Sequence, residues 1–165
     1  LEASGHSVLI TGCDSGFGYA TAIQLNDKGW HVLATVLDYN SDGALTYESV
    51  VKECESRHSK LWSVVNNAGV YGCGELEWGV MQHLETIIQV NVLGYIRVLR
   101  QFLPLIRRSR GRIINVSSVA SLFSAPGTTV YSLSKAAVSS LTDGLRRELY
   151  NTGVDVIEII PQAYK

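Results

Sequence analysis

Neither sign of charge predominates in this 165-residue chain, which carries 14 basic and 15 acidic residues and a formal net charge of −1. The one dense basic cluster, at residues 107–110, is short and is typical of a charged helix end. A nucleic-acid-binding surface would need a longer basic stripe. We therefore expect no nucleic acid partner.

Cysteine is scarce, and long apolar runs are lacking. Cys13, Cys54 and Cys73 are odd in number and lack the spacing of metal ligands, which predicts free thiols, a reducing compartment and no metal site. No apolar run reaches the roughly 18 residues that span a membrane, and the start lacks a signal-peptide pattern. Because the sequence begins at Leu1 rather than Met, we expect a trimmed N-terminus, so membrane-associated or organellar placement stays open.

Short apolar runs alternate with helical patterns along the whole chain, which has neither an internal repeat nor a low-complexity segment. This alternation predicts an α/β fold in one domain, with helices covering both faces of a doubly wound parallel sheet. Strands are expected at residues 7–11, 31–36, 61–65, 111–116 and 154–160, and helices at 18–28, 47–58, 80–108 and 131–150. The longest helix is expected to break near Gly94 and Pro104.

Tyr131 and Lys135 stand four residues apart in a predicted helix, so their side chains project from one face, one turn apart. A phenol has a pKa of about 10 and is a poor acid or base near neutral pH. An ammonium about 4 Å away favours the phenolate, which would bring the phenol pKa towards neutrality. Such a pair on an exposed helix is often just solvated, so its significance depends on the other motifs.

A glycine-rich turn follows the first predicted strand. Gly12, Gly16 and Gly18 have the spacing G-x-x-x-G-x-G, which differs from the G-x-G-x-x-G dinucleotide fingerprint. Glycines allow the backbone to turn tightly and approach a pyrophosphate, whose charge the N-terminus of the next helix favours. A simple connecting turn is the alternative. The position of the turn after the first apolar strand of an alternating chain favours a nucleotide loop.

Five motifs, in this order, resemble those of the short-chain dehydrogenase/reductase family: Thr11-Gly-x-x-x-Gly-x-Gly18, Asn66-Asn67-Ala68-Gly69, Asn91 in Gln-Val-Asn-Val-Leu-Gly, Ser118 in Asn-Val-Ser-Ser, and Tyr131-x-x-x-Lys135. Residues 10–18 and 102–108 are most similar to the branch of retinol, hydroxysteroid and 3-hydroxybutyrate dehydrogenases. The resemblance implies a Rossmann-like fold and an oxidoreductase that transfers a hydride between NAD(P) and a secondary or apolar alcohol or its carbonyl compound.

The resemblance also implies catalytic roles. Tyr131 would exchange a proton with the substrate oxygen, and Ser118 would hold that oxygen. Lys135 would lower the pKa of Tyr131 and bind the nicotinamide ribose, and Asn91 would hold, through its helix geometry, a water that links Lys135 to solvent. Ser117 is the competing serine, one residue away and on the opposite side of the strand.

NAD is the favoured cofactor, with NADP as the second possibility. The position at which family members carry an acid for the ribose 2′-hydroxyl falls on Val36, and Asp38 is the nearest acid, although it could simply start a turn. No lysine or arginine is near to bind a 2′-phosphate. Besides Asp38, the resemblance assigns cofactor contacts to Gly12, Asp14, Ser15, Gly16, Phe17, Gly18, Asn67, Ala68, Gly69, Tyr131, Lys135 and Pro161.

Family members have seven strands in the order 3-2-1-4-5-6-7, and this chain lacks room for strands 3 and 7. The expected sheet is therefore 2-1-4-5-6. We expect residues 1–165 to form one dinucleotide-binding and catalytic domain, with segments left out near residues 38–47 and after residue 161. A chain that is truly this short, with exposed sheet edges, is the alternative.

Two further expectations come from the resemblance. Family members usually pair the helices that correspond to residues 80–108 and 131–150 across two subunits, so we expect a homodimer or homotetramer that acts on a small-molecule alcohol or carbonyl compound. The alternative function is a catalytically inactive nucleotide-binding or scaffold homologue that has lost its substrate lid.

Overall fold

The computed structural model describes residues 3–36 and 47–162. Each predicted strand and helix is present, with ends within a few residues of the expected ones. The elements are β1 (His6–Ile10), α1 (Gly16–Asp27), β2 (His31–Ala34), α2 (Tyr47–Ser56), β3 (Lys60–Asn66), α3 (Met81–Ile88), the π-helix η1 (Gln89–Gly94), α4 (Tyr95–Ser109), β4 (Arg112–Val116), the 3₁₀ turn η2 (Val119–Ser121), α5 (Thr129–Glu148) and β5 (Asp155–Ile159).

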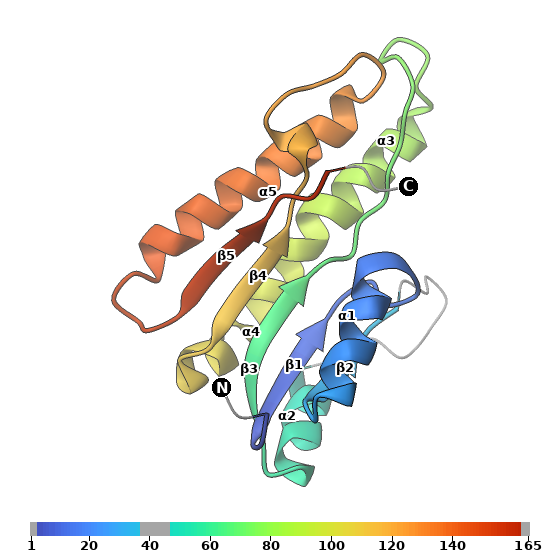
Figure 1. Ribbon diagram of the computed structural model, residues 1–165. Coiled ribbons are helices and arrows are strands. Elements are labelled where there is room, and N and C mark those ends of the chain that lie inside the picture. The colour runs from blue at the N-terminus through green and yellow to red at the C-terminus, as the bar shows by residue number, and fades with distance from the viewer. Residues whose placement is uncertain (1–2, 37–46, 163–165) are drawn as a thin grey trace.

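The five strands form one parallel sheet in the order β2-β1-β3-β4-β5 (Figure 1). This is the expected order 2-1-4-5-6, because β3, β4 and β5 correspond to strands 4, 5 and 6 of the family. The strand β1 lies between β2 and β3, so the chain crosses over β1 on its way from β2 to β3. Helical crossovers between parallel neighbours give a Rossmann-like fold. The three cysteines are free thiols, and no described helix is long and apolar enough to cross a membrane.

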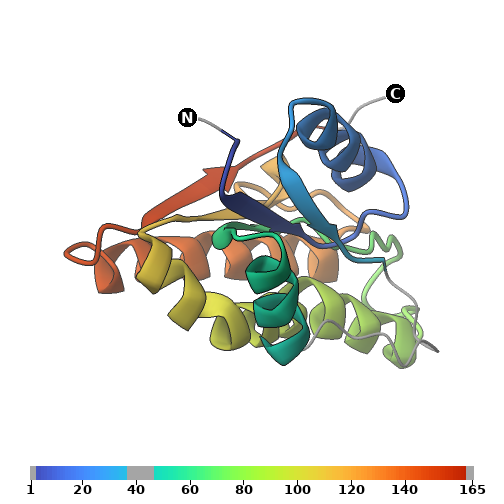
Figure 2. The same cartoon turned by 90° about the horizontal axis from the view of Figure 1, so that it is seen from below.

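Helices lie unequally on the two faces of the sheet. Figure 2 shows α1 on one face and α2, α4 and α5 on the other. Because successive side chains of a strand point to opposite faces, Leu9 joins the larger core under α2, α4 and α5, whereas Val8 and Ile10 join a smaller core under α1.

The expected cover of both faces by helices is therefore incomplete within the described residues. Beside α1, an apolar cavity of about 630 Å³ lies along the sheet as far as Ile114 and Ile159. Residues 37–46, which include Asp38, and residues 163–165 lie outside the described residues, as do the segments expected to be left out near 38–47 and after 161.

The long helix expected at residues 80–108 changes geometry once. Its π-helical segment, η1, ends at Gly94 and contains Asn91, so the break expected near Gly94 is instead a change of helix type, and the chain stays helical into α4. The expected break at Pro104 is wrong, because α4 continues through it to Ser109. Pro104 is exposed, so solvent can reach the carbonyl that its missing N–H leaves without a donor.

Candidate functional site

A cavity of about 800 Å³ opens where β1, β3 and β4 end. Ligands of open α/β sheets bind at the carboxyl ends of the strands. Most of the predicted site residues line this cavity: Gly12, Asp14, Ser15, Gly16, Phe17, Asn67, Ala68, Gly69, Ser118, Tyr131, Lys135 and Pro161. The structure thus brings together five segments that are separate in the sequence. Gly18 and Asn91 are buried beside the cavity without lining it.

The three glycines of the loop are required for different structural reasons. A Cβ at Gly18 would lie 2.1 Å from the Gly12 carbonyl oxygen, and one at Gly12 would lie 2.7 Å from the Ala68 Cα, so both positions are closed to larger residues. Gly12 and Gly16 also have positive φ angles of 70° and 61°, which favour glycine. Gly16 has open space on its Cβ side and lines the cavity, so it leaves room for a ligand.

Hydrogen bonds join the glycine loop to the turn after β3. The Asn67 side-chain amide donates to the carbonyl oxygens of Thr11 and Gly12, at 3.0 Å each. In return, the Thr11 hydroxyl accepts from the backbone N–H groups of Asn67 and Ala68, also at 3.0 Å each. These two turns therefore form one rigid wall of the cavity.

The Tyr131–Lys135 pair lies on α5 at the same cavity. The Tyr131 ring is 4.9 Å from the Tyr71 ring, edge to face. The Lys135 ammonium donates to the Val116 carbonyl oxygen at 3.0 Å and lies 5.9 Å from the centroid of the Tyr131 ring. Lys135 is only 4% exposed, and this burial lowers its pKa to about 8. The positive charge thus lies beside the phenol, and no carboxylate of the described residues forms an ion pair with it.

Ser117 and Ser118, at the end of β4, both border the cavity but have different surroundings. The Ser117 hydroxyl is buried, donates to the Lys135 carbonyl oxygen at 3.4 Å and lies 3.1 Å from the Ser139 hydroxyl. The half-buried Ser118 hydroxyl accepts the Ala120 N–H at 3.2 Å, which leaves its own proton available. Ser118 is the serine suited to hold a substrate oxygen.

Asn91 is fully buried and joins the loop after β3 to α5. Its side-chain oxygen accepts the Val70 N–H at 2.8 Å, and its amide donates to the Val70 carbonyl and to the Ser134 hydroxyl, at 3.0 Å each. Ser134 in turn donates to the Tyr131 carbonyl at 2.6 Å. Asn91 therefore fixes the backbone around the pair on α5 from beneath the cavity.

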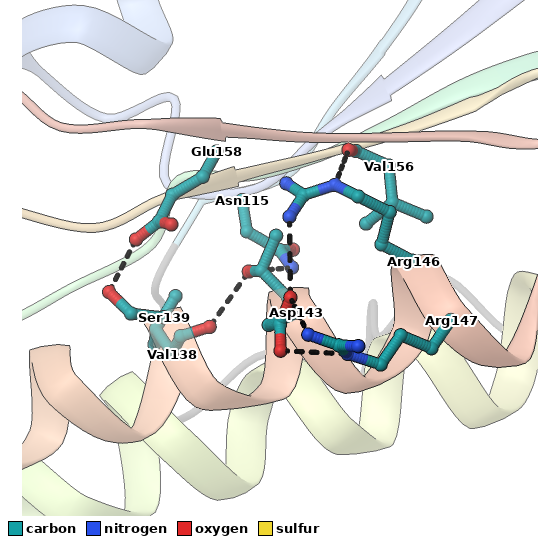
Figure 3. A network of polar contacts seen from close by, with 9 residues as sticks. Asn115, Val138, Ser139, Asp143, Arg146, Arg147, Val156 and Glu158 are labelled. Atoms are coloured by element: carbon teal, nitrogen blue, oxygen red, sulfur yellow. Dashed lines mark hydrogen bonds and ion pairs between the residues drawn. The ribbon is translucent and has the colours of Figure 1, made fainter.

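Polar contacts also fix α5 to the sheet (Figure 3). The Asn115 amide of β4 donates to the Thr142 hydroxyl at 2.9 Å, which donates to the Val138 carbonyl at 2.7 Å. Ser139 donates to the Glu158 carboxylate of β5. A helix that is held at several points presents its side chains with little freedom, as a reaction centre requires.

Sequence reasoning did not select Tyr71 or Tyr95. Tyr71 lines the cavity, two residues after Gly69. Tyr95 is 1% exposed, its hydroxyl donates to the Val116 carbonyl at 3.0 Å, and burial raises its pKa. The one signal for Tyr95 is its position four residues after Asn91, on the same side of the helix.

Comparisons with known proteins agree on one family. The family model described as short chain dehydrogenase matches residues 45–165. The chain is 36% identical over 186 aligned positions to D-beta-hydroxybutyrate dehydrogenase, mitochondrial, of Rattus norvegicus, with 96% of this chain and 54% of that protein covered. It is 42% identical to retinol dehydrogenase 16 of Homo sapiens, with 96% and 56% covered. Hydroxysteroid dehydrogenases match as well.

A solved structure shows the same fold. A short-chain dehydrogenase/reductase from Burkholderia phymatum in complex with NAD superposes with a TM-score of 0.80 at 27% identity, with 98% of this chain and 67% of that chain covered. The chain spans about half the length of the curated relatives that it matches. Because the alignment of 186 positions is longer than 165 residues, the rat protein has residues within the matched region that this chain lacks.

Proposed function

Because the chain belongs to the short-chain dehydrogenase family, we propose that it is an NAD(P)-dependent oxidoreductase that interconverts an alcohol and its carbonyl compound. One observation carries the proposal. Tyr131, Lys135 and Ser118 line the same cavity as the glycine loop, so a bound dinucleotide and a substrate oxygen would meet there. The similarity to retinol, hydroxysteroid and hydroxybutyrate dehydrogenases supports this chemistry.

The cavity fits a nicotinamide dinucleotide. The open side of Gly16 leaves room for a pyrophosphate at the N-terminus of α1, where backbone N–H groups favour an anion. Gly69 and Pro161 would border the nicotinamide end, and Lys135 would bind its ribose. When bound, the cofactor supplies or accepts the hydride. NAD is favoured over NADP because Lys135 is the one cation among the described lining residues.

The side chains of this protein would carry out the proton transfer that accompanies hydride transfer. In reduction, Ser118 would donate a hydrogen bond to the substrate carbonyl oxygen, and Tyr131 would give that oxygen a proton. The Lys135 charge would stabilise the phenolate that remains, and more strongly so in a buried site than in water. Asn91 would keep Tyr131 and Lys135 in place through Ser134.

The lining residues favour an uncharged, apolar substrate. Tyr71, Val119 and Phe123 provide apolar surface beside Tyr131. A 3-hydroxy acid would need a cation for its carboxylate, and Lys135 is already committed to the cofactor side. We therefore propose an apolar alcohol, primary or secondary, in preference to a hydroxy acid.

A substrate screen tests the proposal. Dehydrogenation of a retinoid, a steroid alcohol and 3-hydroxybutyrate is followed at 340 nm with NAD and with NADP. We expect turnover of an apolar alcohol, faster with NAD. A preference for 3-hydroxybutyrate would contradict the substrate class. Nucleotide binding without any turnover would instead support an inactive nucleotide-binding or scaffold homologue.

The assembly and location of the protein are also proposals. Residues 1–165 are proposed to form one dinucleotide-binding and catalytic domain, and α4 and α5 to pair with those of a second copy in a homodimer. Sedimentation at micromolar concentration checks the pairing, and a monomer would refute it. Three free thiols favour a reducing compartment, and the mitochondrial name of the rat relative makes an organelle a reasonable candidate.

A further inference from the structure

Two buried side chains donate to a single backbone oxygen at the end of β4. The Tyr95 hydroxyl of α4 and the Lys135 ammonium of α5 both lie 3.0 Å from the Val116 carbonyl oxygen. The Lys135 nitrogen is also 5.9 Å from the centroid of the Tyr95 ring. A carbonyl oxygen has two lone pairs, so both are used here, and each donor weakens the acceptor for the other.

We propose that Tyr95 is a positioning residue for Lys135: by sharing the Val116 carbonyl, its hydroxyl weakens the hold of that carbonyl on the ammonium and so allows Lys135 to reach the nicotinamide ribose. The inference rests on the proposed function of the cavity. It adds a residue that lies outside the motifs which identify the family.

Burial makes Tyr95 a constant donor. The residue is 1% exposed, and the resulting rise in its pKa keeps the phenol protonated over the whole working range of pH. Its hydroxyl makes one hydrogen bond among the described residues, to Val116. A bond to a charged donor is about twice as strong as a neutral one, so without competition Lys135 would be held firmly to Val116.

Few titratable groups of the described residues lie close enough to Lys135 to change its pKa. Tyr131 and Tyr95 are the titratable side chains whose rings lie within 6 Å of its nitrogen. Burial lowers the pKa of Lys135, and a hydrogen bond from its ammonium to the Val116 carbonyl opposes that effect by favouring the charged form. A change in the hydrogen bonding of Val116 should therefore be visible in the titration of Lys135.

Tyr95→Phe isolates the hydroxyl, because phenylalanine fills the same space and leaves the Val116 carbonyl bonded to Lys135. We expect the pKa of Lys135, measured by NMR of ¹³C-labelled lysine in the protein without cofactor, to rise in the variant. We also expect the Kd for NAD to rise about twofold to tenfold, as for one altered hydrogen bond. Tyr150→Phe, at an 83% exposed tyrosine, is the matched control and should change neither quantity.

Since the lysine titration needs no turnover, it separates the two proposals. An unchanged or lowered Lys135 pKa in a folded Tyr95→Phe variant would overturn the positioning role, even if the wild type is an active dehydrogenase. A raised pKa in a protein that turns over no alcohol would leave the positioning contact standing and would count against the proposed function alone. An unchanged Kd for NAD would overturn the link to cofactor binding.

Discussion

The glycine loop and the Tyr131–Lys135 helix line the same cavity, but they are built in different ways. The loop depends on backbone shape: Gly12 and Gly18 lie so close to other backbone atoms that no side chain fits. The helix depends on side-chain hydrogen bonds: Lys135 donates to the Val116 carbonyl of β4, and Asn91 joins the turn after β3 to Ser134 of α5.

This difference predicts that substitutions in the loop and in the helix impair different properties of the protein. A side chain added to the loop should damage the packing first and nucleotide binding as a consequence. A polar group removed from the helix should damage proton transfer while the fold survives, because buried hydrophobic packing holds the helix elsewhere.

The largest effect is expected at the helix. Tyr131→Phe removes the proposed proton donor and leaves the ring in place, so turnover of an apolar alcohol should fall by about 10²- to 10⁴-fold. The Kd for NAD should change far less than turnover, because the glycine loop and Lys135 are untouched and one hydroxyl contact at most is lost. Steady-state kinetics and equilibrium titration measure the two quantities, with Tyr150→Phe as the matched control. Unchanged turnover would exclude Tyr131 as the acid.

A smaller effect on a different property is expected at the loop. A Cβ at Gly18 would lie 2.1 Å from the Gly12 carbonyl oxygen, so Gly18→Ala must shift the backbone and should lower the free energy of unfolding by about 3 kcal/mol. Gly144→Ala, in α5 with open space around the added methyl, is the control and should stabilise the protein by up to about 1 kcal/mol. Urea unfolding compares them, and equal stabilities would show that the loop is not tightly packed.

The buried charge of the helix gives an effect no larger than that of Gly18→Ala, and this effect depends on pH. Burial lowers the pKa of Lys135 from 10.5 to about 8, so between these values the unfolded chain binds more protons than the folded protein. The free energy of unfolding of the wild type relative to Lys135→Met should therefore rise with pH between 8 and 10.5, by at most about 3 kcal/mol.

Urea unfolding over this pH range measures the difference. Lys52→Met, at an exposed lysine of α2, is the matched control. A flat difference for Lys135→Met would mean that the ammonium is not buried in solution.

The strands, their order and the glycine loop could be predicted from the sequence. Apolar runs such as that at Val8–Ile10 and glycines at fixed spacing are local signals, and the order of the strands came from the resemblance to the family. The break expected at Pro104 failed because that residue lies on the exposed side of α4, where a helix tolerates a missing N–H.

The surroundings of Lys135 could not be predicted, because they depend on contacts between residues that are far apart in the chain. Tyr95 and Lys135 are separated by 40 positions and meet at the backbone oxygen of Val116, which leaves no mark in the sequence. The side-chain contacts of Asn91 with Val70 and Ser134 could not be predicted for the same reason, because they join residues 21 and 43 positions apart.

The central claim is that hydride and proton transfer occur together in the cavity shared by the glycine loop and α5. Single-turnover reaction of the protein with NADH deuterated at both C4 positions and a panel of apolar aldehydes and ketones tests it most directly, with mass spectrometry of the alcohols formed. We predict one deuterium on the carbinol carbon of a product, and none with Tyr131→Phe in the same time. Bound NADH without deuterium in any product would contradict the claim.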